Sequence, residues 1–264
     1  MDIKAIAIDL DGTLLPSSKI ITRHTLEVLN RVMDKGIRVF VATGRSLATC
    51  QRFIEQIGTT DAVICYNGSC IYDPIEKKDL FHRTMSEEIC REIVSLAEKT
   101  EASLQAFRHH RVYYRPDAKN ADFLEPLTSS IGVVIDDFTS LHPLEFTKAM
   151  FIGELEHTEK IRRHLLTTFG ENIHMVYSHP TYFEMMSEGA TKGAALSKLL
   201  QMYDLKADEV MAFGDESNDL EMLALAGHSV AMSNASDQVK KTARYLTGSC
   251  DEEGVAEALK RFIL

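Results

Sequence analysis

The sequence lacks the features that mark membrane, secreted and zinc-binding proteins. No apolar run approaches the roughly 18 residues that span a membrane. The opening residues, MDIKAIAIDLDGTLL, have no signal-peptide pattern, because Asp9 and Asp11 interrupt the apolar run. No C-x-x-C or H-x-x-x-H pair indicates zinc. We therefore expect a cytoplasmic protein with no membrane partner.

Cysteine is scarce and shows no disulfide framework. The five cysteines are odd in number and irregularly spaced, at Cys50, Cys65, Cys70, Cys90 and Cys250. This usage favours reduced thiols that pack as small core residues, as is usual in the cytosol.

A long basic run is also missing. The chain has 29 Lys and Arg against 39 Asp and Glu, a formal charge of −10, which argues against a nucleic-acid partner. An acidic chain can still bind an anionic substrate where a metal ion inverts the local charge. The 264 residues, 45% of them apolar, suffice for one large domain or two ordinary ones.

Apolar runs alternate with amphipathic helical patterns at both ends of the chain. The runs typical of buried strands are residues 4–10, 37–42, 62–66, 209–213, 228–232 and 243–246. The helical patterns begin at Thr22, Ser46, Thr191, Asn218 and Asp251, and Gly36 and Gly58 end the first two. This alternation predicts an α/β fold with a Rossmann-like, doubly wound parallel sheet.

The middle of the chain has a different pattern. Short strand-like runs at 103–107, 111–115, 146–152, 173–177 and 182–186 accompany helical patterns at 86–99 and 158–169. Paired short strands with helices indicate an α+β module that contains an antiparallel sheet. We expect this module, residues 83–187, to be inserted into a discontinuous domain made of residues 1–82 and 188–264.

Polar clusters follow several of the predicted parallel strands. They are Asp9 to Thr13, Thr43 to Arg45, Asn67 to Gly68 and Gly214 to Asp219. Ligands of open parallel sheets bind outside the carboxyl ends of the strands, so all four clusters should converge on one edge. This convergence is a stronger indication of a site than any single cluster.

The first cluster indicates a metal site. Asp9 and Asp11 are two residues apart, so they point the same way while the chain stays extended. With Asp215 they would form a group of repelling carboxylates that a cation must neutralise. Hard oxygen ligands favour Mg²⁺. The alternative is that each aspartate only caps a helix or forms a turn, and Thr43 could likewise cap the next helix.

With these motifs the sequence resembles the haloacid dehalogenase superfamily over essentially its whole length. The matching motifs are D-L-D-G-T at 9–13, T-G-R at 43–45, K-G at 192–193 and G-D-x-x-N-D at 214–219. The long insertion between the second and third motifs is similar to that of the Cof-type sugar phosphatases, which carry a C2-type cap. The resemblance implies a catalytic core with an inserted cap that selects the substrate.

The resemblance also implies a role for each motif residue. Asp9 would attack phosphorus to form an aspartyl-phosphate, and Asp11 would serve as the general acid and base. Mg²⁺ would be held by the carboxylates of Asp9 and Asp215 and by the backbone carbonyl of Asp11, with Asp219 orienting this shell. The phosphoryl oxygens would be bound by Thr43, Lys192, Asn218 and the backbone N–H groups of Leu10 and Gly44.

Some motif positions have a second interpretation. A lysine at a helix start opposes the helix dipole, which favours a functional Lys192 over a solvated one. Arg45 could contact the substrate or act only as a structural ion-pair partner. Glu216 departs from the Asn or Ser that the family often has there.

Residues that would select the organic part of the substrate are harder to identify. The basic and aromatic stretch from Arg108 to Arg115 could contact a sugar or a second phosphate, or it could be a solvated hairpin with Tyr113 or Tyr114 packed on the sheet. The second interpretation is the better supported. The candidates for substrate contacts are Arg45, Asn67, Arg111, Tyr113, His179 and Tyr182.

These features predict a Mg²⁺-dependent phosphatase that acts on small phosphorylated metabolites, such as sugar phosphates, FMN or pyridoxal phosphate. A phosphomutase would use Asp9 in the same way. A catalytically silent phosphometabolite-binding or regulatory protein is a further alternative, which loss of Asp9, Asp11 or Asp215 would favour. All three are present. Nothing in the sequence indicates an oligomeric state.

Overall fold

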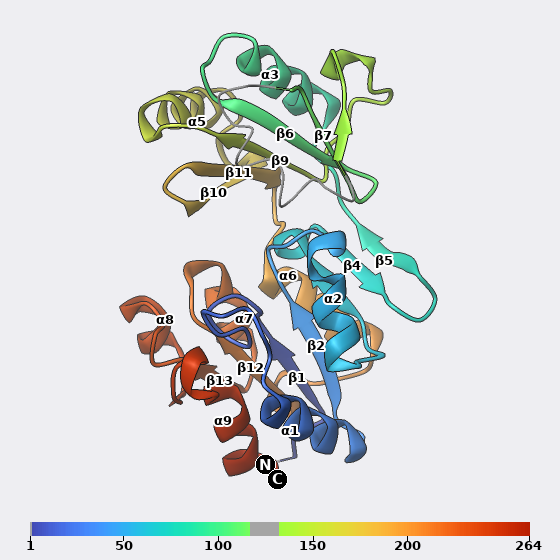
Figure 1. Ribbon diagram of the computed structural model, residues 1–264, viewed down its shortest axis with the longest axis vertical. Coiled ribbons are helices and arrows are strands. Elements are labelled where there is room, and N and C mark those ends of the chain that lie inside the picture. The colour runs from blue at the N-terminus through green and yellow to red at the C-terminus, as the bar shows by residue number, and fades with distance from the viewer. Residues whose placement is uncertain (1, 117–131) are drawn as a thin grey trace. The chain divides into compact units, whose positions relative to one another are not determined.

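The computed structural model describes residues 2–116 and 132–264, which fold into two compact units (Figure 1). Unit 1 combines the N-terminal segment through Phe81 with Thr191–Leu264. Unit 2 consists of the intervening residues, His82–Ala190. Unit 1 is therefore built from both ends of the chain.

A sheet in the order β14-β13-β12-β1-β2-β3-β4-β5 forms the centre of unit 1. Its strands are β1 (Ala5–Ile8), β2 (Arg38–Ala42), β3 (Val63–Cys65), β4 (Cys70–Asp73), β5 (Lys78–His82), β12 (Val210–Gly214), β13 (His228–Ala231) and β14 (Tyr245–Leu246). Strands from β14 to β3 pair in parallel, and β4 returns antiparallel to β3. The register brings Ile8 level with Val41 and Phe213, so three strands end together.

Helices precede or follow the strands of this sheet. They are α1 (Arg23–Asp34), α2 (Leu47–Ile57), α6 (Lys192–Met202), α7 (Leu220–Leu225), α8 (Asp237–Thr242) and α9 (Gly254–Phe262). α1 lies beside α9, and α6 beside α7 (Figure 1). β1 to β3 are buried along most of their length, as expected of a sheet covered by helices. The predicted α/β fold with a doubly wound parallel sheet is confirmed.

Most predicted helix boundaries have the expected chemistry. The hydroxyls of Thr22 and Ser46 accept hydrogen bonds from the first turns of α1 and α2, and Thr191 does the same for α6. Gly58 ends α2 in the left-handed conformation. The expectation for Asp251 was wrong, because its carboxylate accepts hydrogen bonds from the N–H and hydroxyl of Ser17 at 2.7 and 2.8 Å.

Unit 2 contains a sheet in the order β10-β11-β9-β6-β7-β8. Its strands are β6 (Ser103–Arg108), β7 (Arg111–Tyr114), β8 (Gly132–Val134), β9 (Lys148–Ile152), β10 (Ile173–His179) and β11 (Tyr182–Ser187). Neighbours pair antiparallel except β7 with β8. Two helices, α3 (Glu87–Ala97) and α5 (Leu155–Phe169), contribute to its hydrophobic core.

Strand alternation divides the side chains of the unit 2 sheet between two faces. Alternate residues such as Leu104, Ala106, Phe151 and Phe183 join the core that α3 and α5 complete. Burial of each large apolar side chain there contributes about 2–3 kcal/mol. The residues between them belong to the opposite face, which includes Gln105.

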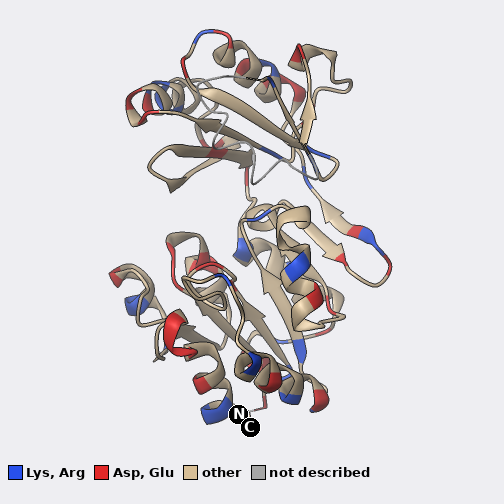
Figure 2. Ribbon diagram, viewed as in Figure 1, with Lys and Arg blue, Asp and Glu red and all other residues tan. Residues whose placement is uncertain are grey.

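The outer helices carry interspersed charges of both signs (Figure 2). Exposed pairs one helical turn apart, such as Arg91 with Glu87, contribute only about 0.3–0.5 kcal/mol each. Burial in the two cores therefore outweighs these surface pairs. Within residues 2–116 and 132–264, no helix has both the length and the apolar character needed to cross a membrane.

A glycine in the turn after β3 supplies a test of the close packing in unit 1. Gly68 has φ +104°, and a Cβ atom there would lie 2.2 Å from the carbonyl oxygen of Thr191. Gly36 has φ +79° but open space around it. Gly36→Ala should cost about 1–2 kcal/mol of unfolding free energy because of backbone strain alone. Gly68→Ala should cost about 1–3 kcal/mol more, because the backbone must also move.

Urea unfolding followed by circular dichroism measures both values. An equal loss of unfolding free energy in Gly36→Ala and Gly68→Ala would contradict the claim that the turn and the start of α6 are in direct contact.

Candidate active site

The polar clusters of unit 1 do converge at the carboxyl ends of its strands. Asp9 follows β1, Thr43 follows β2 and Asp215 follows β12. Asn67 lies in the turn after β3. The aligned ends of β1, β2 and β12 bring residues from distant parts of the sequence to one edge of the sheet.

A buried lysine connects two of the carboxylates. The Lys192 ammonium donates hydrogen bonds to Asp9 Oδ1 at 2.6 Å and to Asp219 Oδ1 at 2.7 Å. Lys192 is the first residue of α6, where the helix dipole disfavours a cation. Burial alone would lower the pKa of Lys192, but Asp219 and Asp9 outweigh burial and raise that pKa. Lys192 is therefore charged.

Asp219 is held by a second set of contacts. Its Oδ2 accepts hydrogen bonds from the backbone N–H groups of Asp215 and Glu216 at 3.0 and 3.2 Å. A Cβ atom at Gly214 would lie 2.5 Å from Asp219 Cβ, so only glycine allows this approach. Asp219 thus fixes both Lys192 and the loop that carries Asp215.

Asp9, Asp215 and Asp219 can each offer an oxygen within 4.8 Å of the others. Three carboxyl groups share one ammonium here, so full ionisation would leave two negative charges uncompensated among these four side chains. Burial raises the pKa of Asp9 well above its usual range, and Asp219 and Asp215 raise it further. Burial, helped by Asp219, raises the pKa of Asp215 to about 6. An oxygen-only donor set with this charge excess fits a divalent cation.

Two residues of the first motif bring Asp215 into this cluster. The Thr13 hydroxyl donates to Asp215 Oδ1 at 2.8 Å. Gly12 has φ +79°, and a Cβ atom there would lie 2.1 Å from Asp215 Oδ2. Thr13 belongs to the D-L-D-G-T motif, but the sequence did not indicate that it positions Asp215.

Asp11 has a different environment from Asp9. Arg45 donates to both of its oxygens, from Nε at 2.6 Å and Nη2 at 2.7 Å, and Lys19 Nζ donates at 2.8 Å. Burial would raise the pKa of Asp11, but the hydrogen bonds from Arg45 and Lys19 outweigh it and lower the pKa to about 2. Asp11 is therefore a carboxylate, and Arg45 is its ion-pair partner. No sequence pattern pointed to Lys19.

The remaining motif residues are held by hydrogen bonds at the same edge. The Thr43 hydroxyl accepts the Arg45 N–H at 3.1 Å, while Ser46 caps α2, so Thr43 is not that helix cap. Asn67 Oδ1 accepts from Asn218 Nδ2 at 2.9 Å. Gly44 leaves room for Asn67, because a Cβ atom there would lie 2.8 Å from its Oδ1.

Leu10 belongs to the turn that follows β1. Its carbonyl accepts the N–H groups of Thr13 at 3.3 Å and Leu15 at 2.7 Å. These bonds fold the segment after Asp9 back on itself. Leu10 is thereby fixed beside the acidic cluster.

Four sequence candidates belong to unit 2. Arg111 is exposed at the start of β7, and Tyr113 packs against the hydrophobic core of unit 2, which favours its structural interpretation. The rings of His179 and Tyr182 are 5.1 Å apart.

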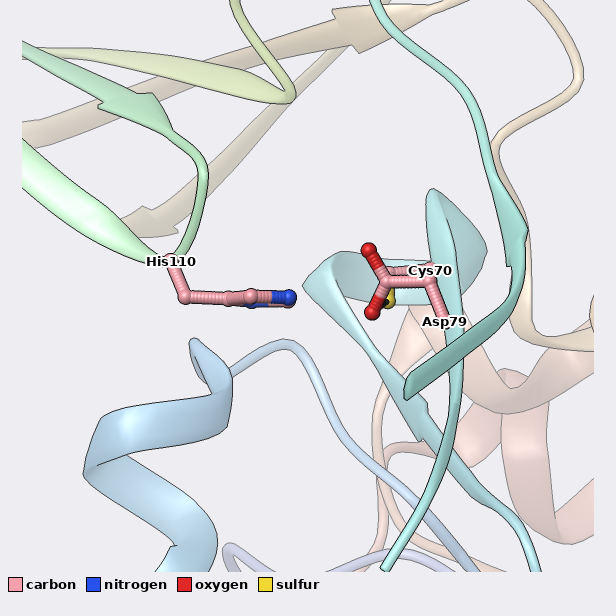
Figure 3. Close-up of side chains that lie close together, drawn as sticks. All are labelled: Cys70, Asp79 and His110. Atoms are coloured by element: carbon pink, nitrogen blue, oxygen red, sulfur yellow. Dashed lines mark hydrogen bonds between the residues drawn. The ribbon is translucent and has the colours of Figure 1, made fainter. Parts of the chain in front are cut away.

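A further polar pair lies elsewhere in unit 1. Cys70 Sγ donates to Asp79 Oδ1 at 3.4 Å (Figure 3). Burial and the nearby carboxylate raise the pKa of the Cys70 thiol. Cys70 is thus held as a thiol, which is a poor nucleophile.

The cluster of Asp9, Asp215 and Asp219 at one edge of the sheet is in keeping with the comparison to known protein families. The family model for haloacid dehalogenase-like hydrolases matches residues 6–259. The chain belongs to this family. The resemblance carried by the motifs is therefore confirmed, and the hydrolase is a phosphoric monoester hydrolase of the haloacid dehalogenase type.

Relatives resemble this hydrolase over nearly their full length. It is 31% identical to the 5-amino-6-(5-phospho-D-ribitylamino)uracil phosphatase YcsE of Bacillus subtilis (strain 168), covering 100% of this chain and 97% of the relative. It is 30% identical to the HMP-PP phosphatase of Serratia proteamaculans (strain 568), covering 97% and 94%. A haloacid dehalogenase-like hydrolase from Bacteroides thetaiotaomicron has a similar structure, with TM-score 0.90, 28% identity and coverage of 99% and 100%.

The raised pKa of Asp215 predicts a pH dependence of stability. Folding raises the pKa of the Asp215 carboxyl from the unfolded-state value near 3.9 to about 6, so the folded state holds this proton more tightly. The resulting stabilisation is fully present below about pH 3.9 and is lost as the pH rises through 6. In metal-free buffer, the unfolding free energy of the wild type relative to Asp215→Asn should fall by about 1–2 kcal/mol between about pH 4 and pH 6.5. Urea unfolding across this range measures the difference.

Asp204→Asn is the matched control, because Asp204 is exposed just after α6. Its difference from the wild type should not change over this range. A pH-independent difference for Asp215→Asn as well would contradict the raised pKa.

Proposed function

We propose that this hydrolase is a Mg²⁺-dependent phosphatase that hydrolyses small phosphorylated metabolites through an aspartyl-phosphate on Asp9. The observation that carries this proposal is the buried cluster of Asp9, Asp215 and Asp219 around Lys192. Unit 1 would be the catalytic core and unit 2 the domain that selects the substrate. The proposal includes neither a nucleic-acid nor a membrane partner.

The metal ligands would be the carboxylates of Asp9 and Asp215 and the backbone carbonyl of Asp11. Mg²⁺ fits because these donors are oxygens and because the cluster carries excess negative charge. When bound, the metal would neutralise charge on the phosphate group. Asp219 would keep its bonds to Lys192 and to the loop, and so orient Asp215.

In the first half of the reaction, a carboxylate oxygen of Asp9 attacks phosphorus. The bond from phosphorus to the ester oxygen breaks, and Asp11 gives that oxygen a proton. Lys192, Thr43, Asn218 and the Leu10 and Gly44 N–H groups bind phosphoryl oxygens. Charge neutralisation and positioning supply most of the acceleration in phosphoryl transfer.

In the second half, Asp11 takes a proton from a water molecule, which then attacks the phosphorus of the aspartyl-phosphate. The bond from phosphorus to Asp9 breaks, inorganic phosphate leaves, and Asp9 is restored. The hydrogen bonds from Arg45 and Lys19 keep Asp11 in the ionised form from which this step starts, and they also make it a weaker base.

The first half requires Asp11 to hold a proton, although Arg45 and Lys19 lower its pKa to about 2. Those two contacts must therefore loosen before the proton is transferred. A phosphate ester offers Arg45 and Lys19 another anion to bind, which provides a route to that change. Arg45 would then contact both Asp11 and the substrate during one cycle.

The names of the relatives suggest a range of substrates. One relative is a phosphatase for a ribitylamino-uracil phosphate and another is an HMP-PP phosphatase. Together with the predicted sugar phosphates, FMN and pyridoxal phosphate, they favour small phosphorylated metabolites that include cofactors or their precursors.

Phosphate release from a panel of esters tests the mechanism. The panel contains sugar phosphates, FMN, pyridoxal phosphate and p-nitrophenyl phosphate. Wild-type release should stop when EDTA removes divalent metal and return with Mg²⁺. Asp9→Asn should lower it to background, because the amide is not a nucleophile. Asp11→Asn should lower it by about 10²–10⁴-fold through loss of the acid and base.

Asp204→Asn should stay within about twofold of the wild type, because a surface substitution away from the site has little effect. Release that persists in Asp9→Asn would exclude Asp9 as the nucleophile. Phosphoryl transfer within an ester without phosphate release would instead support a phosphomutase. Tight ester binding with no turnover in Mg²⁺ would support a silent binding protein.

A further inference from the structure

The edge strand β10 of unit 2 lacks the residues that usually prevent pairing with another chain. It has β11 on one side and, among residues 2–116 and 132–264, no strand on the other (Figure 1). Its seven residues, IHMVYSH, contain no Lys, Arg, Asp, Glu or Pro, and its bulge is confined to the end, between Tyr177 and His179. Half of the backbone N–H and C=O groups of such a strand point outward along the edge. β10 is therefore a template for a further strand.

The strands at the other edges of the two sheets are short or charged. β8 has three residues and β14 has two. β5 has five residues, but it begins with Lys78 and Asp79. Short edges and charged edges both discourage pairing between chains. Among these four edge strands, β10 is the one whose length and composition permit a partner strand.

Helix α5 adds a surface beside the same edge. His164 Nε2 of α5 lies 2.7 Å from a carboxylate oxygen of Glu92, so this side of α5 faces α3. The Tyr177 hydroxyl of β10 lies 3.3 Å from the Thr158 hydroxyl and 3.4 Å from a Glu159 oxygen. With 3.6 residues per turn, Glu159 and His164 are separated by about 140° around the helix. The side of α5 that carries Glu159 is therefore turned away from α3 and lies next to β10.

Four residues form a stripe on that side of the helix, which we call the α5 stripe. Leu155, Glu159, Arg162 and Leu166 follow one another at helical spacing, three or four residues apart. Leu155 is 56% exposed and Leu166 is 46% exposed. Between them, Arg162 donates to both carboxylate oxygens of Glu159, at 2.7 and 2.8 Å. The α5 stripe thus has an exposed apolar residue at each end and opposite charges in its middle.

The order of these residues is self-complementary in an antiparallel pair of helices. The midpoint between Leu155 and Leu166 is also the midpoint between Glu159 and Arg162. A twofold axis at this point would place Leu155 against Leu166 of a second copy, and Glu159 against its Arg162. Such reciprocal contacts are the pattern of a closed twofold interface. An unrelated peptide could add to β10, but it would not match this order of charges and leucines.

The same axis would serve β10, whose central residue is Val176. Tyr177 contacts α5 at Thr158 and Glu159, about two residues or roughly 3 Å before the midpoint of the stripe. β10 returns along α5 after the short turn at Gly170–Asn172. A step of roughly 3 Å is about one strand residue, which leads from Tyr177 back to Val176. One twofold axis therefore passes near the centres of both the stripe and the strand.

We propose that unit 2 binds a second copy of this chain through a twofold interface made of the α5 stripe and the outer edge of β10. The two β10 strands would pair antiparallel and join the two unit 2 sheets into one, while the two α5 helices pack side by side. Main-chain hydrogen bonds would supply affinity, and the stripe would select the partner and the register. This inference goes beyond the proposed function and does not depend on it.

Sedimentation velocity of the full chain over a dilution series measures its association. The wild type should sediment as a dimer that dissociates on dilution. Leu155→Glu and Leu166→Glu should each weaken association at least about tenfold, because each places a charge against an apolar residue of the second copy. Met202→Glu is the matched control, since Met202 is a 50% exposed apolar residue on α6, and it should leave association unchanged. A wild type that is monomeric at every concentration, or a dimer that neither leucine variant weakens, would overturn the inference.

Charge reversal tests the register of the two helices. Glu159→Lys and Arg162→Glu should each weaken association, because like charges then meet across the axis. An equimolar mixture of the two variants should associate again, since the new lysine of one variant faces the new glutamate of the other. This recovery would also show that neither variant is misfolded. A mixture that associates no better than its two components would overturn the twofold register.

Hydrogen–deuterium exchange tests the pairing of the strands. The outward-facing amides of β10 should exchange at least about tenfold more slowly in the wild-type dimer than in monomeric Leu166→Glu, because pairing protects them. β8, the other edge strand of the same sheet, is the internal control and should exchange equally in both. Equal exchange of β10 in the dimer and the monomer would overturn the strand pairing.

Discussion

The site in unit 1 depends on one buried ammonium. Lys192 lies between Asp9 and Asp219, and without it three carboxylates would face one another inside the protein. Removing one partner from a buried charged pair costs about 3–5 kcal/mol, because the other charge is left uncompensated. Lys192 therefore determines both the placement of Asp9 and the orientation of the loop after β12.

The convergence of the motifs that follow the parallel strands could be predicted from the sequence, because their positions follow from strand geometry. Once β1, β2 and β12 are parallel neighbours, Asp9, Thr43 and Asp215 must end at one edge. Contacts made by irregular segments could not be predicted from the sequence. Lys19 reaches Asp11 from a stretch with no periodic pattern, and Asp251 bonds to Ser17 across 234 residues. The β4–β5 hairpin was missed because Lys78–His82 is at most half-buried and shows no clear alternation.

The turn from Tyr66 to Gly68 shows how local strain is held at such a site. Tyr66 and Asn67 have φ of +52° and +54°, a conformation that costs about 1–2 kcal/mol for each non-glycine residue. The Tyr66 and Asn67 N–H groups donate to the carbonyls of Arg45 and Thr43 at 2.9 and 3.1 Å, which holds the turn in place. Asn67 is thereby directed at Asn218. The strained turn after β3 is therefore linked to the loop after β12 through the hydrogen bond between Asn67 and Asn218.

The division of unit 1 between two chain segments has a consequence for synthesis on the ribosome. β1 emerges first, yet its partner β12 begins 205 residues later, at Val210. The continuous unit 2 can fold while the central sheet of unit 1 is still incomplete, since domains generally fold as units during translation. Asp9 and Lys192, 183 residues apart, cannot meet until almost three quarters of the chain has been made. Early in synthesis the apolar β1 to β3 segments are therefore exposed, and they need protection from aggregation until the C-terminal segment arrives.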